Sequence, residues 1–409
     1  MNVIKIKDLL NSQEFLAYLI GLVLSTLLIG YAPSSIALGF FLFFSFRYSF
    51  LQKKKLKTDL YLLLPMLLYV LFVLTFIWSV NQGQTKTGLE RTIALLVVPL
   101  AFNVIPKVSF ENYKRILNVF TFSNLLFGLV FLINAFDTFH RTNSISVFTY
   151  HELVSLLDLN AIYVSVIFSI SLFYLLTKTR KTKWDLWMIV FFLILLLLLS
   201  SKTVMFVLFI GIFIYLFCYG TKISKTKTLL GLIGLGLLIG IGSINLKQRV
   251  LFEKDTNLSE ILEKEQFGQI YPWTGSSIRL LQLRILKEQL EEESIFWKGF
   301  GLFASRDNLK KRHIKFDTYP TFHDYNYHNQ YAQIFSETGI FGICLLIMML
   351  LIPLYKVLKS KNFLFTMFYI LVGSVFFTES LLWRQQGLFL FVILYCLTTR
   401  TSFEKTHTS

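Results

Sequence analysis

Long apolar runs separated by short polar connections dominate this chain. A run of about 17–25 apolar residues can cross the hydrocarbon core of a bilayer as a helix, and by this criterion the sequence holds about twelve candidate spans. The pattern therefore predicts an all-α polytopic membrane protein. The spans are predicted at residues 15–31, 34–50, 60–80, 88–105, 115–136, 159–177, 184–200, 203–219, 228–246, 333–355, 362–380 and 386–399.

The composition supports a membrane protein. Of the 409 residues, 55% are hydrophobic and only 16% are charged, whereas about a quarter of the residues in a soluble domain are charged. Cys218, Cys344 and Cys396 lie far apart, in or beside apolar runs. This spacing supports neither a zinc site nor a disulfide framework.

The formal net charge of +16 is explained by the connections between spans. Lys and Arg gather in every even-numbered connection, and the odd-numbered ones are sparse in them or nearly charge-balanced. By the positive-inside rule both termini are cytoplasmic, so the charge sets orientation and indicates no nucleic-acid partner. The first span is interpreted as a signal anchor, because no cleavage site follows it. The basic residues are Lys53, Lys54, Lys55, Lys57, Lys107, Lys114, Arg115, Lys178, Arg180, Lys181, Lys183, Lys222, Lys225, Lys227, Lys356, Lys359, Lys361, Arg400 and Lys405.

This topology divides the chain into three parts. Residues 1–246 hold the first nine spans, residues 247–332 form a large external loop, and residues 333–409 hold the last three spans and a short tail. Loops of that length in compact proteins are usually functional or disordered. A helix is predicted here from Ser276 to Glu293, so we expect a partly helical loop. Its apolar positions at helical spacing are Ile278, Leu281, Ile285 and Leu286.

The stretch from His328 to Gly342 closes the loop and opens the tenth span. If it is one continuous helix, Gly339 and Gly342 share nearly one face with His328. An imidazole would then lie above a strip of two glycines, and histidine is well suited to remove a proton from a sugar hydroxyl near neutral pH. The alternative is a Gly-x-x-Gly helix-packing step beside an inactive histidine.

Cations near the external surface form a second group of candidates. Arg279 and Arg284 lie on the predicted loop helix, and Arg91 and Lys202 lie at the outer ends of spans, where the positive-inside rule does not require them. A guanidinium group presents five donors that suit a diphosphate. The alternatives are snorkelling to lipid headgroups for Arg279 and a local ion pair with Glu90 for Arg91.

Other charged residues and motifs limit the possible chemistry. Arg384 and Glu379 are interpreted as a structural ion pair at the outer edge. The sequence has no His-Glu-x-x-His metal motif, no Gly-x-Ser-x-Gly nucleophile elbow and no glycine-rich phosphate loop. The external connection after the first span, residues 31–33, is also not Asp-rich, so we expect a metal-independent reaction and no cofactor. Whether the residues of the segment 136–158 join the site or only cap helices stays open. Those residues are His140, His151 and Glu152.

On these residues the sequence resembles the O-antigen ligase / O-antigen polymerase superfamily of bacterial envelope glycosyltransferases. His328-Asn329, then nine residues, then Gly339-x-x-Gly342 is similar to the pattern that ends a large periplasmic loop in that family. The family's Arg-x-x-x-Leu element looks like the segment that begins at Arg279.

Two further segments extend the resemblance. The family's short glycine-containing turn resembles residues 297–301. Ser201-Lys202 is similar to a Ser-Arg pair of the family, but lysine replaces arginine and puts bidentate phosphate binding there in doubt.

The resemblance implies a GT-C-like glycosyltransferase of the bacterial inner membrane, with its active site at the periplasmic face. The donor would be a glycan on undecaprenyl diphosphate, and the acceptor lipid A–core or another glycan. A single, inverting, metal-independent displacement is implied, in which His328 activates an acceptor hydroxyl. The residues implied to stabilise the departing diphosphate are Arg279, Arg91, Arg284 and Lys202, and those implied to support the site are Asn329, Gly339 and Gly342.

Several functions remain open at this level. The His-Asn pattern and the arginine-bearing helix favour a ligase, and the alternative is a polymerase that joins lipid-linked repeat units. A lipid-linked oligosaccharide transporter would also have about twelve helices, but we would expect its cations inside a central cavity rather than at the outer edge.

Overall fold

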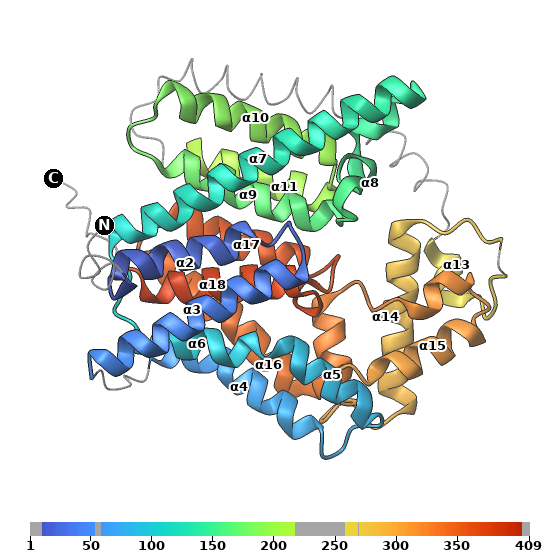
Figure 1. Cartoon of the computed structure of the whole chain (residues 1–409). Helices are drawn as coiled ribbons and strands as arrows, with labels where there is room; N and C mark the ends of the chain where they lie inside the picture. Colours follow the sequence, from blue (N-terminus) through green and yellow to red (C-terminus); the bar gives the residue numbers. More distant parts are fainter. Residues whose placement is uncertain (1–9, 54–58, 217–257, 269, 403–409) are drawn as a thin grey trace.

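The computed structural model describes residues 10–53, 59–216, 258–268 and 270–402, and these residues form helices joined by short connections, with no β-strand (Figure 1). The predicted span 228–246 lies outside the described residues, as do Cys218 and the basic residues Lys54, Lys55, Lys57, Lys222, Lys225, Lys227 and Lys405.

Each predicted span within the described residues corresponds to one helix, except that two consecutive helices, α5 and α6, cover 88–105. Gln82–Val104, Tyr31–Leu51, Phe110–Thr142 and Gln330–Lys359 are long and apolar enough to cross a membrane. The chain is thus a helical membrane protein, and the number of twelve spans stays a prediction. The bundle consists of α2 (Gln13–Ser25), α3 (Tyr31–Leu51), α4 (Leu60–Thr75), α5 (Gln82–Thr92), α6 (Ala94–Val104), α7 (Phe110–Thr142), α9 (Ala161–Thr177), α10 (Lys183–Leu199), α11 (Lys202–Ile214), α16 (Gln330–Lys359), α17 (Phe363–Val375) and α18 (Gln385–Arg400).

Short polar residues before the apolar runs determine where many of these helices begin. Their side-chain oxygens accept hydrogen bonds from backbone N–H groups of the first turn, which otherwise have no partner inside the helix. Thr182 and Asp185 form a reciprocal capping box at the start of α10. The other capping residues in the bundle are Ser12, Asp59, Asn81, Ser109, Asn160, Asn329 and Asn362.

Burial separates central from peripheral helices. Every residue of α18 from Gln386 to Arg400 is buried, and α9 is buried from Ala161 to Leu175. In contrast, α3 and α10 expose large apolar side chains, including Phe43 and Trp184. Exposed apolar surface of this kind fits a lipid environment.

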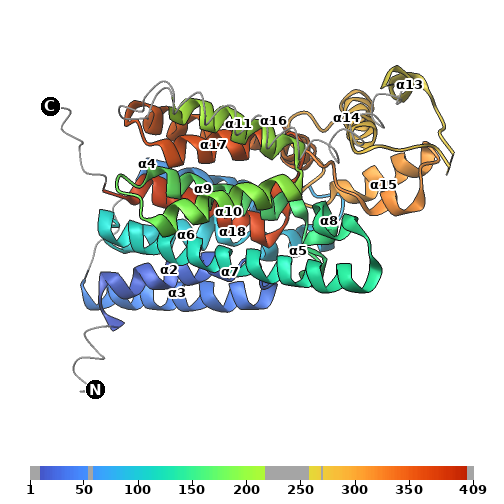
Figure 2. The same cartoon turned by 90° about the horizontal axis from the view of Figure 1, so that it is seen from above.

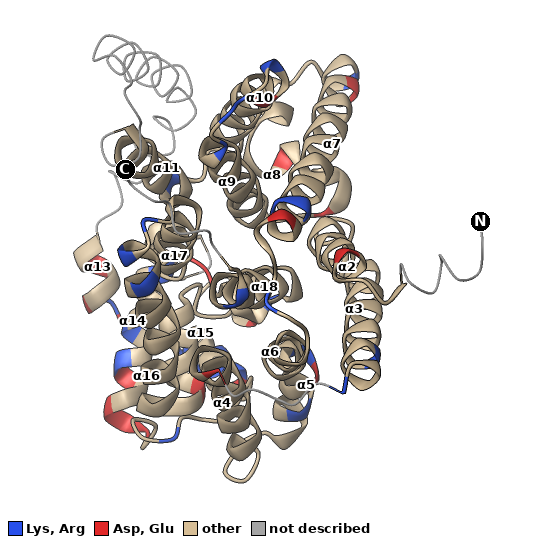
Figure 3. Ribbon diagram, turned by 90° about the vertical axis from the view of Figure 1, so that its left-hand side faces the viewer, with Lys and Arg blue, Asp and Glu red and all other residues tan. Residues whose placement is uncertain are grey.

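Basic connections meet at one end of the bundle. The beginning of α2 and the end of α18 lie there, and Lys and Arg occupy several helix ends on this face (Figure 3). Arg400 connects the end of α18 to two other segments at this end of the bundle. Its Nη2 donates to the Ile105 carbonyl oxygen at 3.1 Å, and its Nη1 lies 3.9 Å from Asp59 Oδ2.

The other end of the bundle carries a small helical domain, which we call the loop domain (Figures 1 and 2). It consists of α13 (Leu258–Glu263), α14 (Gly275–Glu292), α15 (Ser305–Lys315) and η4 (Pro320–Asp324). The amphipathic helix expected at Ser276–Glu293 is therefore present, and its apolar face packs into a core separate from that of the bundle. The α14 members of this core are Ile278, Leu281, Ile285 and Leu286.

The segment from His328 to Gly342 does not form a continuous helix. Asn329 is the N-cap of α16, so His328 lies outside the helix, in the left-handed region with φ 44°. Gly339 interrupts α16 with φ 65° and ψ −157°. The predicted alignment of His328 with Gly339 and Gly342 on one helical face is therefore wrong.

The break in α16 has a clear packing reason. The segment 296–301 lies against it and forms backbone hydrogen bonds from Ile340 N to Phe296 O (2.9 Å) and from Phe300 N to Ser336 O (2.8 Å). A Cβ on Gly339 would collide with the Trp297 backbone. Gly339 thus permits close backbone packing, and Gly342 makes room for the Thr338 side chain, so neither leaves room for an alkyl chain.

Candidate functional site

A cavity of about 970 Å³ lies where the loop domain meets the bundle. Four arginines line it, together with two histidines and two carboxylates. The arginines are Arg91, Arg279, Arg306 and Arg384, and the histidines and carboxylates are His151, His328, Asp324 and Glu379. Within the described part of the chain, no group of three His, Cys, Asp or Glu side chains is arranged to hold a metal ion.

His328 is fixed by its local turn. Its backbone N–H donates to Asn326 Oδ1 at 2.8 Å, and its neighbour Asn329 caps α16 by accepting from Ala332 N at 3.0 Å. Asn329 Nδ2 also donates to the Phe377 carbonyl oxygen at 3.2 Å. These contacts tie the turn to the segment that follows α17, so Asn329 positions His328 through the backbone.

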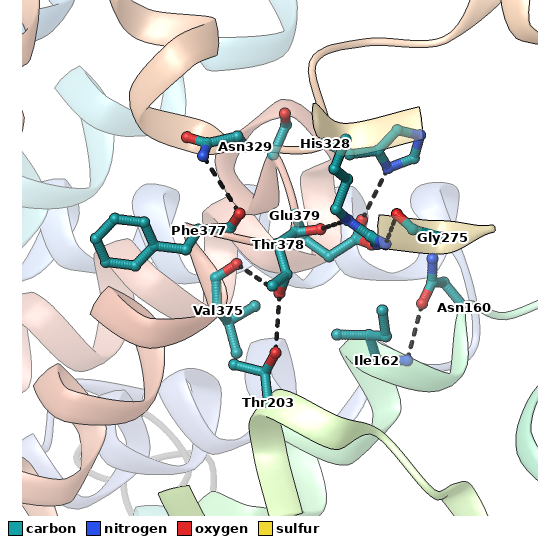
Figure 4. A network of polar contacts seen from close by, with 12 residues as sticks. Asn160, Ile162, Thr203, Gly275, His328, Asn329, Val375, Phe377, Thr378 and Glu379 are labelled. Atoms are coloured by element: carbon teal, nitrogen blue, oxygen red, sulfur yellow. Dashed lines mark hydrogen bonds and ion pairs between the residues drawn. The ribbon is translucent and has the colours of Figure 1, made fainter. Parts of the chain in front are cut away.

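Glu379 is the central acceptor of the site (Figure 4). The predicted span 362–380 ends as a helix at Val375, and Glu379 lies beyond it in the connection to α18. One carboxylate oxygen, Oε2, is 3.5 Å from His328 Nδ1, and the other, Oε1, accepts from Arg279 Nη2 at 2.8 Å. Glu379 therefore pairs with Arg279 and His328, and the predicted ion pair with Arg384 is wrong.

Arg279 is held at three points. Besides Glu379, its Nε donates to the Thr378 carbonyl oxygen and its Nη1 to the Gly275 carbonyl oxygen, both at 2.8 Å. Burial raises the pKa of Glu379, but hydrogen bonding and charge from His328 and Arg279 lower it by more, so the pKa is below the usual glutamate value. The carboxylate is ionised at neutral pH and offsets much of the Arg279 charge.

This arrangement suits a general base. A carboxylate beside Nδ1 favours a proton on that nitrogen and leaves the lone pair of Nε2 for a hydroxyl group in the cavity. The His328 side chain is 24% exposed, which leaves the ring accessible, whereas that of Glu379 is 7% exposed. His328 is thus the accessible base of the pair, and Glu379 is the buried residue that orients it.

The three other arginines of the cavity lie against aromatic rings. Phe303 and Trp383 stack with their centroids 4.4 Å apart. The Cζ atom of Arg91 is 5.8 Å from the Phe303 ring centroid, and that of Arg306 is 5.3 Å from the Trp383 ring centroid.

Arg384 has a similar contact, with its Cζ 5.8 Å from the Tyr163 ring centroid. Among the described residues, no carboxylate forms an ion pair with these three guanidinium groups. Ring contacts hold a guanidinium group in place without consuming its N–H donors, so the three groups can bind an anion.

Two of the predicted phosphate-binding residues lie elsewhere. Arg284 Nη1 donates to the carbonyl oxygens of Ile261 (2.9 Å) and Lys264 (2.7 Å), and its Nε donates to Glu288. Its guanidinium group also covers Phe316 within the loop domain. Because these contacts use its donors away from the cavity, Arg284 is a structural residue of the loop domain.

Lys202 opens α11 and does not line the cavity. The residue after it, Thr203, donates to Thr378 Oγ1 at 3.4 Å. Lys202 therefore precedes a residue that contacts the connection carrying Glu379, but it is not part of the cavity wall.

The external segment 136–158 contributes one of its three candidate residues to the cavity wall. His151, in α8 (Tyr150–Leu153), lines the cavity, and its Nδ1 accepts from Ala161 N at 3.3 Å at the start of α9. His140 and Glu152 do not line the cavity. The segment thus both caps a helix and forms part of the cavity wall.

Sequence reasoning missed Arg306 and the role of Glu379. Arg306 lies in α15, within a strongly basic segment that gives no indication of which cation faces a cavity. An acidic residue near the end of an apolar run was the available signal for Glu379, since a charge at that position needs a partner.

The sequence was also compared with known proteins. Residues 187–347 match a family model described as O-Antigen ligase, and the match includes most of α10, all of α11, Arg279, His328 and the break in α16. No curated protein matches the chain. This match over residues 187–347 supports the resemblance of the chain to the O-antigen ligase-like superfamily.

Proposed function

We propose that this protein is a glycosyltransferase that moves a glycan from undecaprenyl diphosphate to lipid A–core. The observation that best supports the proposal is the Glu379–His328 pair at the wall of a cavity that also presents Arg91, Arg306 and Arg384. The site thus combines a base for a hydroxyl group with fixed cations for a diphosphate, as this reaction requires.

The proposed reaction is a single inverting displacement. His328 Nε2 takes the proton of an acceptor hydroxyl as the oxygen attacks the anomeric carbon of the donor. The bond from that carbon to the phosphate oxygen breaks, and undecaprenyl diphosphate leaves with the bonding electron pair. Charge that develops on the leaving oxygen is stabilised by the guanidinium groups, which are already in position.

The structure changes the roles we assign to the basic residues. Arg91 stays a donor-binding residue and is joined by Arg306 and Arg384, whose charges no carboxylate in the described part of the chain offsets by an ion pair. Arg279 becomes chiefly a positioning residue, because Glu379 offsets its charge. Guanidinium groups balance the diphosphate in this proposal, which is therefore metal-independent.

We also propose an inner-membrane orientation with cytoplasmic termini and a periplasmic cavity. Lys and Arg gather at the bundle end where α2 begins and α18 ends (Figure 3). The loop domain, which contributes to the cavity lining, lies at the other end (Figure 1). The positive-inside rule assigns the basic end to the cytoplasm. Membrane lipids would surround the exposed apolar faces of α3 and α10.

The experiment that tests the proposal supplies the purified protein with an oligosaccharide on undecaprenyl diphosphate, with and without lipid A–core. Mass spectrometry then sizes the products. One oligosaccharide added to lipid A–core is the expected result. A ladder of longer undecaprenyl-linked chains without lipid A–core would instead establish a polymerase, and absence of any transfer would refute both.

A further inference from the structure

The cavity has an aromatic wall that the proposed chemistry does not use. Trp273, Phe322 and Tyr325 of the loop region line it, and successive ring centroids from Trp273 to Phe322 and Phe322 to Tyr325 are 5.8 and 5.1 Å apart. The next centroid distance, from Tyr325 to His328, is 4.9 Å. We call Trp273, Phe322 and Tyr325 the aromatic track, and it ends at the proposed base.

The loop-domain core supports the track from behind. The Phe267 ring lies 4.8 Å from the Trp273 ring and 6.1 Å from the ring of buried Phe316. The three rings of the track themselves are only partly buried. They are therefore held in place while parts of their surfaces face the cavity.

Polar groups lie beside these rings. Asp324 and Asn326 alternate with Phe322 and Tyr325 along the chain and line the same cavity. The Asp324 carboxylate is largely exposed and lies 3.5 Å from Lys310 Nζ. A row of ring faces with carboxylate and amide groups at its edge suits a sugar, whose C–H faces pack on rings and whose hydroxyl groups donate to oxygens. A lipid tail has no hydroxyl groups to donate to these oxygens.

The track and the donor-binding arginines are separate clusters. The rings of the track contact one another and His328, whereas Arg91 and Arg306 contact the Phe303–Trp383 pair. In a single displacement, the attacking and leaving oxygens lie on opposite faces of the anomeric carbon, so the two substrates need separate binding surfaces. The base must touch the acceptor, and the track is the surface that leads to the base.

We propose that the aromatic track is the acceptor-sugar subsite, in which Trp273, Phe322 and Tyr325 bind the saccharide that presents its hydroxyl to His328. The inference rests on the proposed transferase function and deepens it. The chemical class it assigns to the ligand is a carbohydrate, bound through ring faces and short polar side chains, and the diphosphate binds elsewhere in the cavity.

The test measures transfer kinetics with lipid A–core as the varied acceptor. Phe322→Leu and Trp273→Leu keep an apolar side chain but remove the flat ring, and each should raise the KM for lipid A–core about tenfold, the upper range for the loss of one aromatic contact. The kcat and the KM for the undecaprenyl-diphosphate donor should change by less than about twofold, because the donor is held by other groups. Phe322→Tyr and Trp273→Phe should recover most of the acceptor affinity.

A matched control is available in the same segment. Tyr319 is a half-exposed aromatic residue whose ring lies 6.0 Å from that of Phe322, but it does not line the cavity. Tyr319→Leu should leave the KM for lipid A–core unchanged. An unchanged acceptor KM in Phe322→Leu and Trp273→Leu, or an equal rise in the donor KM, would overturn the inference.

Failure of the proposed function is distinguished by a second measurement. If the wild-type protein transfers no glycan, binding of core oligosaccharide released from lipid A–core is measured by saturation-transfer NMR, and binding of sugar-free undecaprenyl diphosphate is measured separately. Weaker oligosaccharide binding by Phe322→Leu, with unchanged undecaprenyl diphosphate binding, would support the subsite without the reaction. If the wild type does not bind the oligosaccharide, the subsite is wrong.

Discussion

Two arginine environments in one cavity differ in how the charge is compensated. Arg279 donates to a buried carboxylate and two carbonyl oxygens, whereas Arg91 and Arg306 lie on opposite members of a stacked Phe303–Trp383 pair. The first environment fixes Glu379 beside His328 and leaves little net charge. The second holds two cations in place and keeps their donors free for an anion. The comparison teaches that the partners of an arginine, more than its position in a motif, determine its role in catalysis.

The largest expected effect comes from removing His328, the base beside the Arg279–Glu379 pair. His328→Ala should reduce kcat by about 100- to 10,000-fold, the range for general base catalysis, while donor binding stays intact. Steady-state transfer rates and binding of undecaprenyl diphosphate measure the two quantities. His328→Ala that still folds and inserts, yet transfers glycan at the wild-type rate, would remove the base assignment.

Glu379→Gln should have the next largest effect. The amide keeps the shape of the side chain but cannot stabilise a positively charged imidazole, so kcat should fall about 100-fold. The same variant releases the charge of Arg279, and binding of undecaprenyl diphosphate should be retained. If donor affinity falls while kcat does not, Glu379 supports donor binding rather than the base.

Arg306→Ala tests the second environment. The loss of one charge-assisted contact should weaken binding of undecaprenyl diphosphate about tenfold, and the effect should shrink at high salt. Arg284→Ala is a matched control, because this arginine lies in the same domain and donates to the carbonyl oxygens of Ile261 and Lys264 outside the cavity. We expect Arg284→Ala to lower the midpoint of thermal unfolding without changing donor affinity. Equal donor affinities for the two variants would contradict the distinction.

The smallest expected effect is on how the folding stability depends on pH. The pKa of Glu379 is lowered in the folded protein, because the contributions of His328 and Arg279 exceed the opposing one of burial. Its ionised form therefore stabilises the fold above the ordinary glutamate pKa, and this contribution is lost as the pH falls through the lowered value. The gap in unfolding midpoint between wild type and Glu379→Gln should narrow from pH 7 to about pH 3. A gap that does not change with pH would show that ionisation of Glu379 adds no stability.

Much of the fold was predictable because its signals are local. Apolar runs predicted helices at the described spans, and the spacing of Ile278, Leu281 and Ile285 predicted the amphipathic helix of the loop domain. The break at Gly339 was not predictable from helical periodicity. Its cause is the backbone of residues 296–301, which is far away in the sequence.

The site was predictable to the extent that a motif marked its residues. His328, Arg279 and Arg91 do line one cavity. Glu379 was assigned to Arg384 because the two are close in sequence, whereas the fold brings Arg279 to it from a hundred residues away. Arg284 shows the converse, because its position on the same helix as Arg279 does not reveal that it faces the domain core.

The central claim is that Glu379 acts through His328. A double-mutant cycle on kcat tests it most directly, with His328→Ala, Glu379→Gln and the combined variant assayed on the same donor and acceptor. Residues that act as a unit have strongly non-additive effects, so the account predicts that the combined variant is no slower than His328→Ala alone. A combined variant in which the two losses multiply would contradict the account and give Glu379 a role independent of the histidine.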